Sequence, residues 1–516
     1  MRRPFQNEPP VDFSVEENRA AMREQLRIVE SELGKEYPLV IGGEKIETGQ
    51  HIVSRNPGNI DQVVGRVARG TSDHANKAIA AAEKAFKTWR TMSPEGRASV
   101  AFRLAGLLRR NRLYLSAWMV YELDKAWDEA DGEIAEAIDM MEWNGREALR
   151  LGSTAPNASI PEEANTFHYL PIGVGAIIPP WNFPAAIYTN LTMAPVIAGN
   201  TVVVKPASNT PVIGYKIFEL MRQAGVPDGV VNFLPGSGEE IGDTLVDHPR
   251  TRFVAFTGSK AVGMRIYERA AKVQPGQQWL KRVTTEMGGK DAIIVDAEVD
   301  VQAAIEGIVI SAFGFQGQKC SACSRAIVHS DVYDQVVEGV VKFTEETVKF
   351  GPALDGDSTV GAVVDEKQFN SINEYIEIGK QEGRLAYQAN QIEANGYYVP
   401  PTIFADVPPD ARIATEEIFG PVLAIVKADD YDHALEIAND TEYGLTGSVY
   451  SRNREHLERA RYEFEVGNLY FNRKCTGALM GVHPFGGTKM SGTNTKSGGP
   501  DYLQNFMQTR AVGEAV

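Results

Sequence analysis

Cysteine is scarce in this chain: its 516 residues include three, Cys320, Cys323 and Cys475. A small, odd number in a chain of this length argues against a disulfide framework and is typical of a reducing compartment. The Cys320-x-x-Cys323 spacing matches half of a zinc site or a redox pair. Zinc would need two further ligands, and only Cys475 and eight scattered histidines remain to supply them. The sequence therefore predicts no metal.

Long hydrophobic runs are missing as well. No segment reaches the roughly 18 continuous apolar residues that a membrane span needs. No apolar stretch follows Met1-Arg2-Arg3, as a signal peptide would require. A net charge of −16 repels the phosphate backbone of nucleic acids. We therefore expect a cytoplasmic protein without a membrane or nucleic-acid partner, although local amides and one lysine can still bind a phosphate-bearing cofactor.

The hydrophobic patterns indicate an α/β protein, and the length predicts two large domains or a few smaller ones. Residues 12–36 carry an apolar stripe at helical spacing: Met22, Leu26, Val29 and Leu33. From about residue 165, short β-rich runs alternate with helical stretches; the runs are Val174–Ile178, Thr201–Val204, Val230–Leu234 and Arg252–Phe256. This alternation predicts βαβ units and a parallel sheet. A second α/β series follows Gly288-Gly289.

Two glycine motifs of the first series are candidates for a phosphate site. The segment from Gly236 to Gly242, with Gly238 inside it, follows a strand and opens a helix, where amides attract negative charge. Its GxGxxxG spacing departs from the usual dinucleotide fingerprint, and such a turn is more often structural. Phe256-Thr-Gly258-Ser259 ends a second strand, which favours a dinucleotide pocket. Lys205 ends a third strand, where open α/β sheets bind ligands, although a solvated lysine fits equally well.

Three residues have the chemistry for covalent catalysis. Cys320 follows Lys319, whose charge is expected to lower the pKa of the thiol; a buried core thiol is the alternative. Glu286 lies beside paired glycines at an apparent domain junction, where burial would raise its pKa and suit it as a general base. Asn182 lies in a proline-stiffened turn and could donate to an oxyanion. An ordinary surface carboxylate would explain the Glu286 pattern as well, and a packing turn would explain the Asn182 pattern.

Six motifs taken together, in this order, resemble the aldehyde dehydrogenase superfamily. They are Pro-Trp-Asn-Phe-Pro (180–184), Lys-Pro-Ala (205–207), Phe-Thr-Gly-Ser (256–259), Glu-Met-Gly-Gly-Lys (286–290), Gly-Gln-Lys-Cys (317–320) and Glu-Glu-Ile-Phe-Gly-Pro-Val (416–422). The likeness extends over nearly the whole chain. It implies a Rossmann-type dinucleotide-binding domain (1–150 and 168–286), an α/β catalytic domain (287–485) and a β oligomerisation arm (151–167 and 486–516).

The resemblance also implies residue roles. Cys320 would attack an aldehyde and carry a thioester, Asn182 would bind the oxyanion, and Glu286 would activate water. The presence of Glu286 favours hydrolysis over transfer to coenzyme A. The cofactor NAD would contact Trp181, Lys205, Ser208, Gly238, Gly258, Ser259, Glu417 and Phe419. Ser208 replaces a glutamate that many strict NAD users have, so we expect NADP to be tolerated.

The closer resemblance is to the branch that oxidises L-glutamate 5-semialdehyde, in equilibrium with 1-pyrroline-5-carboxylate, to L-glutamate in proline and arginine breakdown. It rests on Phe313–Ala322, Tyr375–Lys380, Gly467–Arg473, Thr476–Ala478 and His483–Gly487. It implies a homodimer or higher homo-oligomer, and substrate contacts from Glu136, Phe183, Ser321, Gly477, Ala478 and Phe485. The alternatives are another semialdehyde dehydrogenase, such as one for succinate semialdehyde, or a non-catalytic structural relative.

Overall fold

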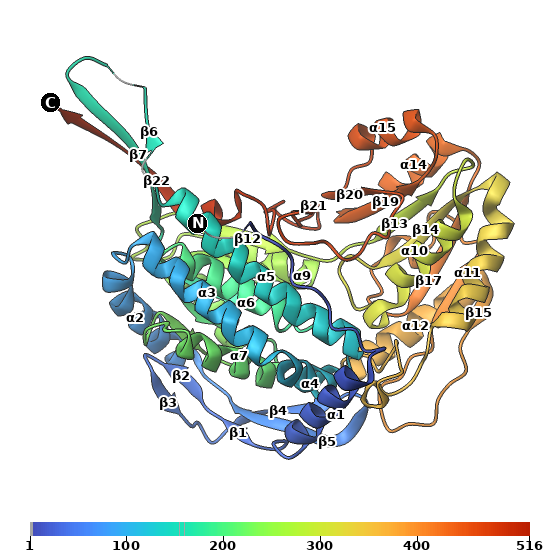
Figure 1. Cartoon of the computed structure of the whole chain (residues 1–516), viewed down its shortest axis with the longest axis horizontal. Helices are drawn as coiled ribbons and strands as arrows, with labels where there is room; N and C mark the ends of the chain where they lie inside the picture. Colours follow the sequence, from blue (N-terminus) through green and yellow to red (C-terminus); the bar gives the residue numbers. More distant parts are fainter. Residues whose placement is uncertain (1–3, 154, 159) are drawn as a thin grey trace.

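The computed structural model describes residues 4–153, 155–158 and 160–516. Positions 1–3, in the predicted dinucleotide-binding domain, and 154 and 159, in the predicted arm, lie outside the described residues. Two lobes stand side by side, each built on a seven-stranded sheet, and a slender three-stranded arm projects from one of them (Figure 1). The predicted α/β class, with a cofactor-type lobe, a second α/β lobe and a β arm, is confirmed.

The first sheet has the strand order β12-β11-β8-β9-β10-β2-β3, and its first five strands are parallel. Their bounds are Arg282–Glu286, Thr251–Thr257, Val174–Ile178, Thr201–Val204, Val231–Phe233, Leu39–Ile41 and Glu44–Ile46. The surrounding helices are α2 (Ser72–Trp89), α3 (Pro94–Arg110), α4 (Arg112–Leu123), α5 (Trp127–Leu151), α6 (Ala186–Ile197), α7 (Pro211–Gln223), α8 (Asp243–Asp247) and α9 (Lys260–Ala271). The four strands predicted from the alternating pattern are all present.

Successive residues of these strands enter two different hydrophobic cores. Val202 and Val204 of β9 pack with the α3, α5, α6 and α7 side, whereas Val203 packs with α2 and α8. Because neighbouring side chains point to opposite faces, a continuous apolar run marks a strand buried on both sides. That is why the sequence reads as unbroken β-branched runs here.

The N-terminal helix is shorter than predicted. Helix α1 spans Glu16–Glu30 and buries Met22, Leu26 and Val29, as the stripe predicted. It ends at Glu30, and the chain then turns through residues 31–34, where Gly34 adopts φ 77°, in the left-handed region. The chain then enters a small sheet of β1 (Glu36–Tyr37), β5 (Asn59–Ala68) and β4 (His51–Asn56).

The second sheet has the order β15-β16-β17-β14-β13-β19-β20. Its strands are Arg384–Gln388, Thr402–Ala405, Val422–Ala428, Cys323–His329, Asp291–Val295, Thr446–Tyr450 and Asn468–Phe471. The helices of this lobe are α10 (Val301–Phe313), α11 (Tyr333–Thr347), α12 (Glu366–Glu382), α13 (Arg412–Thr415), α14 (Tyr431–Asn439) and α15 (Arg454–Glu463). Only residues 287–290 separate the last strand of the first sheet from β13, so Glu286 lies at the junction of the lobes.

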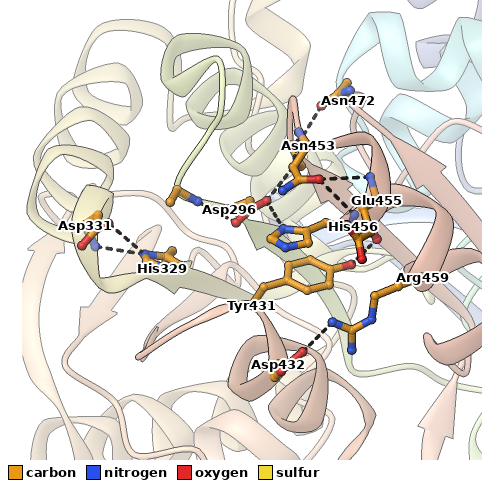
Figure 2. Close-up of polar contacts among 12 residues, drawn as sticks. Asp296, His329, Asp331, Tyr431, Asp432, Asn453, Glu455, His456, Arg459 and Asn472 are labelled. Atoms are coloured by element: carbon orange, nitrogen blue, oxygen red, sulfur yellow. Dashed lines mark hydrogen bonds and ion pairs between the residues drawn. The ribbon is translucent and has the colours of Figure 1, made fainter.

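Polar side chains of the second lobe lie at the carboxyl edge of its sheet (Figure 2). Asp296, directly after β13, is buried and accepts hydrogen bonds from Ser451 Oγ and His456 Nδ1 at 2.5 and 2.7 Å. His456 stacks on Tyr431 with a centroid distance of 4.0 Å, and the Tyr431 hydroxyl donates to the His456 carbonyl at 2.6 Å. This network joins α14 and α15 to the sheet and occupies the edge where open α/β sheets otherwise bind ligands.

The arm consists of β22 (Met507–Ala515), β7 (Glu163–Pro171) and β6 (Ala155–Pro156), and the C-terminus lies at its tip (Figure 1). Strand β22 pairs antiparallel with β7 in continuous register from Met507↔Pro171 to Ala515↔Glu163. The predicted segment 486–516 therefore divides: its last part forms the arm, and residues 486–499 return to the junction of the lobes. No helix in the described part of the chain is long and apolar enough to cross a bilayer.

Candidate active site

Five parallel strands deliver the predicted cofactor residues to one edge of the first sheet. Trp181 follows β8, Lys205 follows β9, Gly238 follows β10, Gly258 and Ser259 follow β11, and Glu286 ends β12. Strand connections run in opposite directions from β8, so the sheet has its switch point between β8 and β11. Open α/β sheets bind their ligands at the carboxyl ends of the strands at such a point.

The end of β9 offers a cation and open backbone. The Lys205 ammonium group is buried and donates to the carbonyls of Pro206 and Gly236 at 3.1 and 3.4 Å. Burial lowers the pKa of Lys205 to about 8. An anionic or hydroxyl-rich ligand would give its ammonium group further hydrogen-bond partners. No atom lies within 4 Å of where a side chain on Gly238 would begin, and Ser208 is exposed. This cradle fits the phosphates and ribose of a dinucleotide.

Glu417 and an aromatic pair lie between the lobes. Glu417 Oε1 accepts the Gly289 amide at 3.0 Å, and burial raises the pKa of Glu417 to about 7. A Cβ atom on Gly288 would lie 2.1 Å from Glu417 Oε1, so any larger residue there would displace the Glu417 carboxylate. Phe419, at φ 57°, meets Trp181 edge to face with ring centroids 5.5 Å apart. Residues from the two lobes thus meet at this point.

Buried glutamines hold the loop that carries Cys320. Phe315 and Gln316 adopt left-handed φ values of 51° and 57°, which cost about 1–3 kcal/mol each in non-glycine residues. The Gln316 amide offsets this strain by donating to carbonyls of two neighbouring segments at 3.2 and 2.8 Å. The Gln318 carbonyl accepts from Asn182 Nδ2 at 3.0 Å. This bond ties the predicted oxyanion donor to the nucleophile loop.

The thiol of Cys320 is surrounded by carboxylates. Burial raises the pKa of Cys320 well above its usual range, and the negative charges of Asp291, Glu417 and Glu286 raise it further. Glu286 and Cys320 therefore share one electrostatic environment at the junction of the lobes, as the predicted chemistry requires. Both effects favour the thiol form of Cys320 over the thiolate.

The predicted influence of Lys319 on Cys320 is wrong. Lys319 Nζ forms an ion pair with Glu129 at 2.6 Å. The largest effects on the thiol, which are burial and the charges of Asp291, Glu417 and Glu286, raise its pKa instead of lowering it. Adjacent residues in an irregular loop direct their side chains to different neighbours. The Lys319 ammonium group therefore points to Glu129 and not to the Cys320 sulfur.

A buried ion pair that was not predicted from the sequence lies behind Asn182. Lys125 and Glu133 are both fully buried and paired, and Lys125 Nζ donates to the Asn182 carbonyl at 3.1 Å. Glu133 Oε1 accepts the amides of Ala185 and Ala186 at 2.6 and 3.0 Å. The pair thereby fixes the backbone on both sides of the proline-stiffened turn. No short sequence pattern marks the pair, because Lys125 lies between α4 and α5 and Glu133 lies within α5.

Glu286 is the last residue of β12, and its carboxylate is enclosed by glycines. Oε2 accepts the Gly487 amide at 3.0 Å, whereas Oε1 is buried without a hydrogen-bond partner. Burial raises the pKa of Glu286 to about 8. A carboxylate with one free oxygen and a raised pKa is suited to accept a proton from a bound water molecule.

The predicted substrate residues lie at the same junction. Phe183 meets Phe315 edge to face at 6.2 Å, and Lys125 Nζ lies over both rings at 4.2 and 4.0 Å. Glu136, on α5, is partly exposed, and burial together with the charge of Glu133 raises its pKa to about 8.

The remaining predicted substrate residues lie next to the nucleophile and on the loop after β20. Ser321 follows Cys320 and is largely buried, and its carbonyl accepts from Cys475 Sγ at 3.4 Å. Gly477 has φ 73°, and its carbonyl accepts from Arg473 at 3.1 Å; Ala478 comes next. Phe485 pairs with Ser497 through two backbone hydrogen bonds of 2.8 Å. Their roles stay predictions.

The model of the aldehyde dehydrogenase family matches residues 45–512, and this chain belongs to that family. It is 57% identical over 514 residues to a 1-pyrroline-5-carboxylate dehydrogenase of Geobacillus kaustophilus, covering 100% of both chains. The 1-pyrroline-5-carboxylate dehydrogenase from Thermus, crystallised with bound NAD, is similar at TM-score 0.98 and 52% identity, again over 100% of both chains. A proline utilization A chain from Bdellovibrio bacteriovorus matches all of this chain with 54% of its own length, at 44% identity and TM-score 0.98.

Proposed function

We propose that this protein oxidises L-glutamate 5-semialdehyde to L-glutamate with NAD, through a thioester on Cys320. The observation that carries the proposal is the convergence of Cys320, Glu286 and the strand-end cradle on one junction between the lobes. The substrate assignment is supported by two relatives, each named 1-pyrroline-5-carboxylate dehydrogenase and matching over full length.

The residues divide the reaction into two stages. The Cys320 thiol releases its proton to solvent, and its sulfur attacks the aldehyde carbon. The developing oxyanion accepts hydrogen bonds from Asn182 Nδ2 and the Cys320 amide. Asn182 has two amide protons, and one of them is bound to Gln318. The other is free for the oxyanion. When bound, NAD supplies the acceptor for the hydride that leaves the substrate carbon.

Glu286 completes the second stage. Its free Oε1 takes a proton from water as the water oxygen attacks the thioester carbonyl, which releases the carboxylate product and returns the sulfur of Cys320. Lys205 and Glu417 would hold the ribose groups of the cofactor, with Gly238, Gly258 and Ser259 near the pyrophosphate. Trp181 and Phe419 would line the nicotinamide pocket.

The variant Glu286→Gln tests this division. It retains the shape of Glu286 but cannot accept a proton, so we expect a rapid burst of about one NADH per site followed by severely slowed turnover. Stopped-flow absorbance measures both phases. An unchanged steady-state rate would remove Glu286 from the mechanism.

The substrate's α-carboxylate is expected to bind Ser321 and the amides of Gly477 and Ala478, while Phe183 and Phe485 clamp its aliphatic body and Glu136 lies at the mouth. Ser321→Ala should then raise KM for glutamate semialdehyde more than for propanal, which has no α-carboxylate. Equal effects on both aldehydes would contradict the anchor.

We also propose a homo-oligomer in the cytoplasm. The outer edge of β22 is unpaired and largely exposed in the described part of the chain, and an exposed strand edge is a template for pairing with a second copy. The three cysteines are free, which fits a reducing compartment. Deleting residues 507–516 should lower the mass of the oligomer measured by light scattering. An unchanged oligomer mass would show that the arm does not hold the subunits together.

A further inference from the structure

The turn at residues 484–487 places the backbone against the carboxylate of Glu286. A Cβ atom on Gly486 would lie 3.1 Å from Glu286 Oε1, and one on Gly492 would lie 2.9 Å from Oε2. The Gly487 amide is the hydrogen-bond donor to Oε2. The orientation of Glu286 therefore depends on where this turn lies.

Lys496 holds that turn in place. Its Nζ donates to the carbonyls of Gly486 and Gly467 and lies 3.4 Å from Asn468 Oδ1. Asn468 reinforces the contact, since its Oδ1 accepts the Gly486 amide at 3.1 Å and its Nδ2 donates to the Pro484 carbonyl at 2.9 Å. One ammonium group thus joins the end of the turn to the start of β20.

Lys496 also supplies the positive charge that acts on Glu286. Its charge lowers the pKa of Glu286 against the larger, opposite effect of burial. Glu286 in turn raises the pKa values of Cys320 and Tyr502. Both are uncharged when protonated, so Lys496 is the cation of this group.

We propose that Lys496 is a positioning residue for the general base. It fixes the Gly487 amide on Glu286 and keeps enough of the carboxylate ionised to accept a proton from water at neutral pH. This inference rests on the proposed role of Glu286 in thioester hydrolysis. Lys496 acts on the second stage of the reaction and not on the attack by Cys320.

Three substitutions separate charge from hydrogen bonding. Lys496→Met removes both, Lys496→Gln retains a donor without charge, and Lys496→Arg retains both. Lys489 provides a matched control: it lies seven residues earlier, donates to the Asn439 carbonyl at 2.8 Å and pairs with Glu465 at 2.7 Å. Each variant is assayed as the full-length protein for burst rate, steady-state kcat from pH 6 to 10, and thermal unfolding.

Loss of a nearby opposite charge raises the pKa of a carboxyl group, typically by one to three units for a close partner. Lys496 is half-buried, so in Lys496→Met and Lys496→Gln we expect the acidic limb of the kcat–pH profile to move to higher pH by about one unit. At pH 7 this shift lowers kcat roughly tenfold. The hydride burst should stay within about twofold of the parent, because a base that acts only in the second stage does not enter the first. Lys496→Arg should restore the limb, and Lys489→Met should leave it in place.

An unshifted limb in both uncharged variants would overturn the proposal, whether kcat is unchanged or falls equally at every pH. Glu286→Gln, measured in parallel, distinguishes a failure of the Lys496 proposal from a failure of the proposed function. If it stops turnover while the Lys496 variants leave the limb unmoved, only the Lys496 proposal fails. If Glu286→Gln turns over normally, the proposed function fails and the Lys496 proposal falls with it.

Discussion

A single methyl group on Gly288 should weaken cofactor binding without touching the cofactor. A Cβ atom at this position would lie 2.1 and 2.2 Å from the two Glu417 oxygens, well inside van der Waals contact. The flexible end of Glu417 must therefore move. It then loses its 3.0 Å hydrogen bond from the Gly289 amide and its place at the proposed ribose site.

The expected magnitude follows from that hydrogen bond. A hydrogen bond to a charged group contributes about 1.5–3 kcal/mol, which corresponds to roughly 10- to 150-fold in an equilibrium constant. We expect Gly288→Ala to raise KM for NAD by a factor in this range. Initial rates at saturating aldehyde, with Kd for NAD from fluorescence quenching, measure it.

A double-mutant cycle supplies the control. In a Glu417→Ala background there is no carboxylate to displace, so adding Gly288→Ala should change KM for NAD by less than about twofold. If the glycine substitution raises KM by the same factor in both backgrounds, its effect does not pass through Glu417 and the reasoning is refuted.

Four further predictions concern separate parts of the molecule. Asn182→Ala should slow the hydride burst by about 100- to 1,000-fold, the typical effect of losing one oxyanion donor; a burst within tenfold of the parent would contradict that role. Because Glu286 acts in its ionised form and its pKa is raised to about 8, kcat should increase from pH 6 through pH 8 and level off only above about pH 9; a flat profile between pH 6 and about pH 9 would argue against it. Ser208→Glu should lower kcat/KM for NADP at least tenfold through repulsion of the 2′-phosphate and leave NAD largely unaffected, and the parent ratio of kcat/KM, NADP over NAD, should exceed about one in a thousand, roughly 4 kcal/mol. Asp296→Ala should lower the free energy of unfolding by about 2–3 kcal/mol, because it leaves buried donors unpaired, while kcat per folded molecule stays unchanged; denaturant titration and active-site counting test both halves.

The sequence predicts those parts of the fold that depend on the hydrophobic pattern of a few consecutive residues. Val202, Val203 and Val204 read as a doubly buried strand because each side chain enters a core, one side or the other. Lys205 could be placed at a ligand edge because topology puts every carboxyl end of a parallel sheet on the same side. The end of the first helix was misjudged because the apolar stripe continues to Leu33, which lies in a turn beyond the end of the helix at Glu30.

The site could be predicted only where a motif encodes it. Cys320, Glu286 and Asn182 were found through ordered motifs, whereas no short pattern marks Lys125 and Glu133, whose partners are other elements. Lys319 shows the converse: its neighbour in sequence is Cys320, but its neighbour in space is Glu129. Electrostatics depends on through-space distance, which a linear pattern does not contain.

The carboxylates around Cys320 have a consequence for the chemical durability of the protein. Alkylating agents and peroxides react with thiolates far faster than with thiols, and the surroundings of Cys320 favour its thiol form. The protein on its own should therefore react with iodoacetamide more slowly at neutral pH than a free cysteine does, and faster as the pH rises. A nucleophile held mainly as a thiol is consumed more slowly by oxidants in the intervals between substrates.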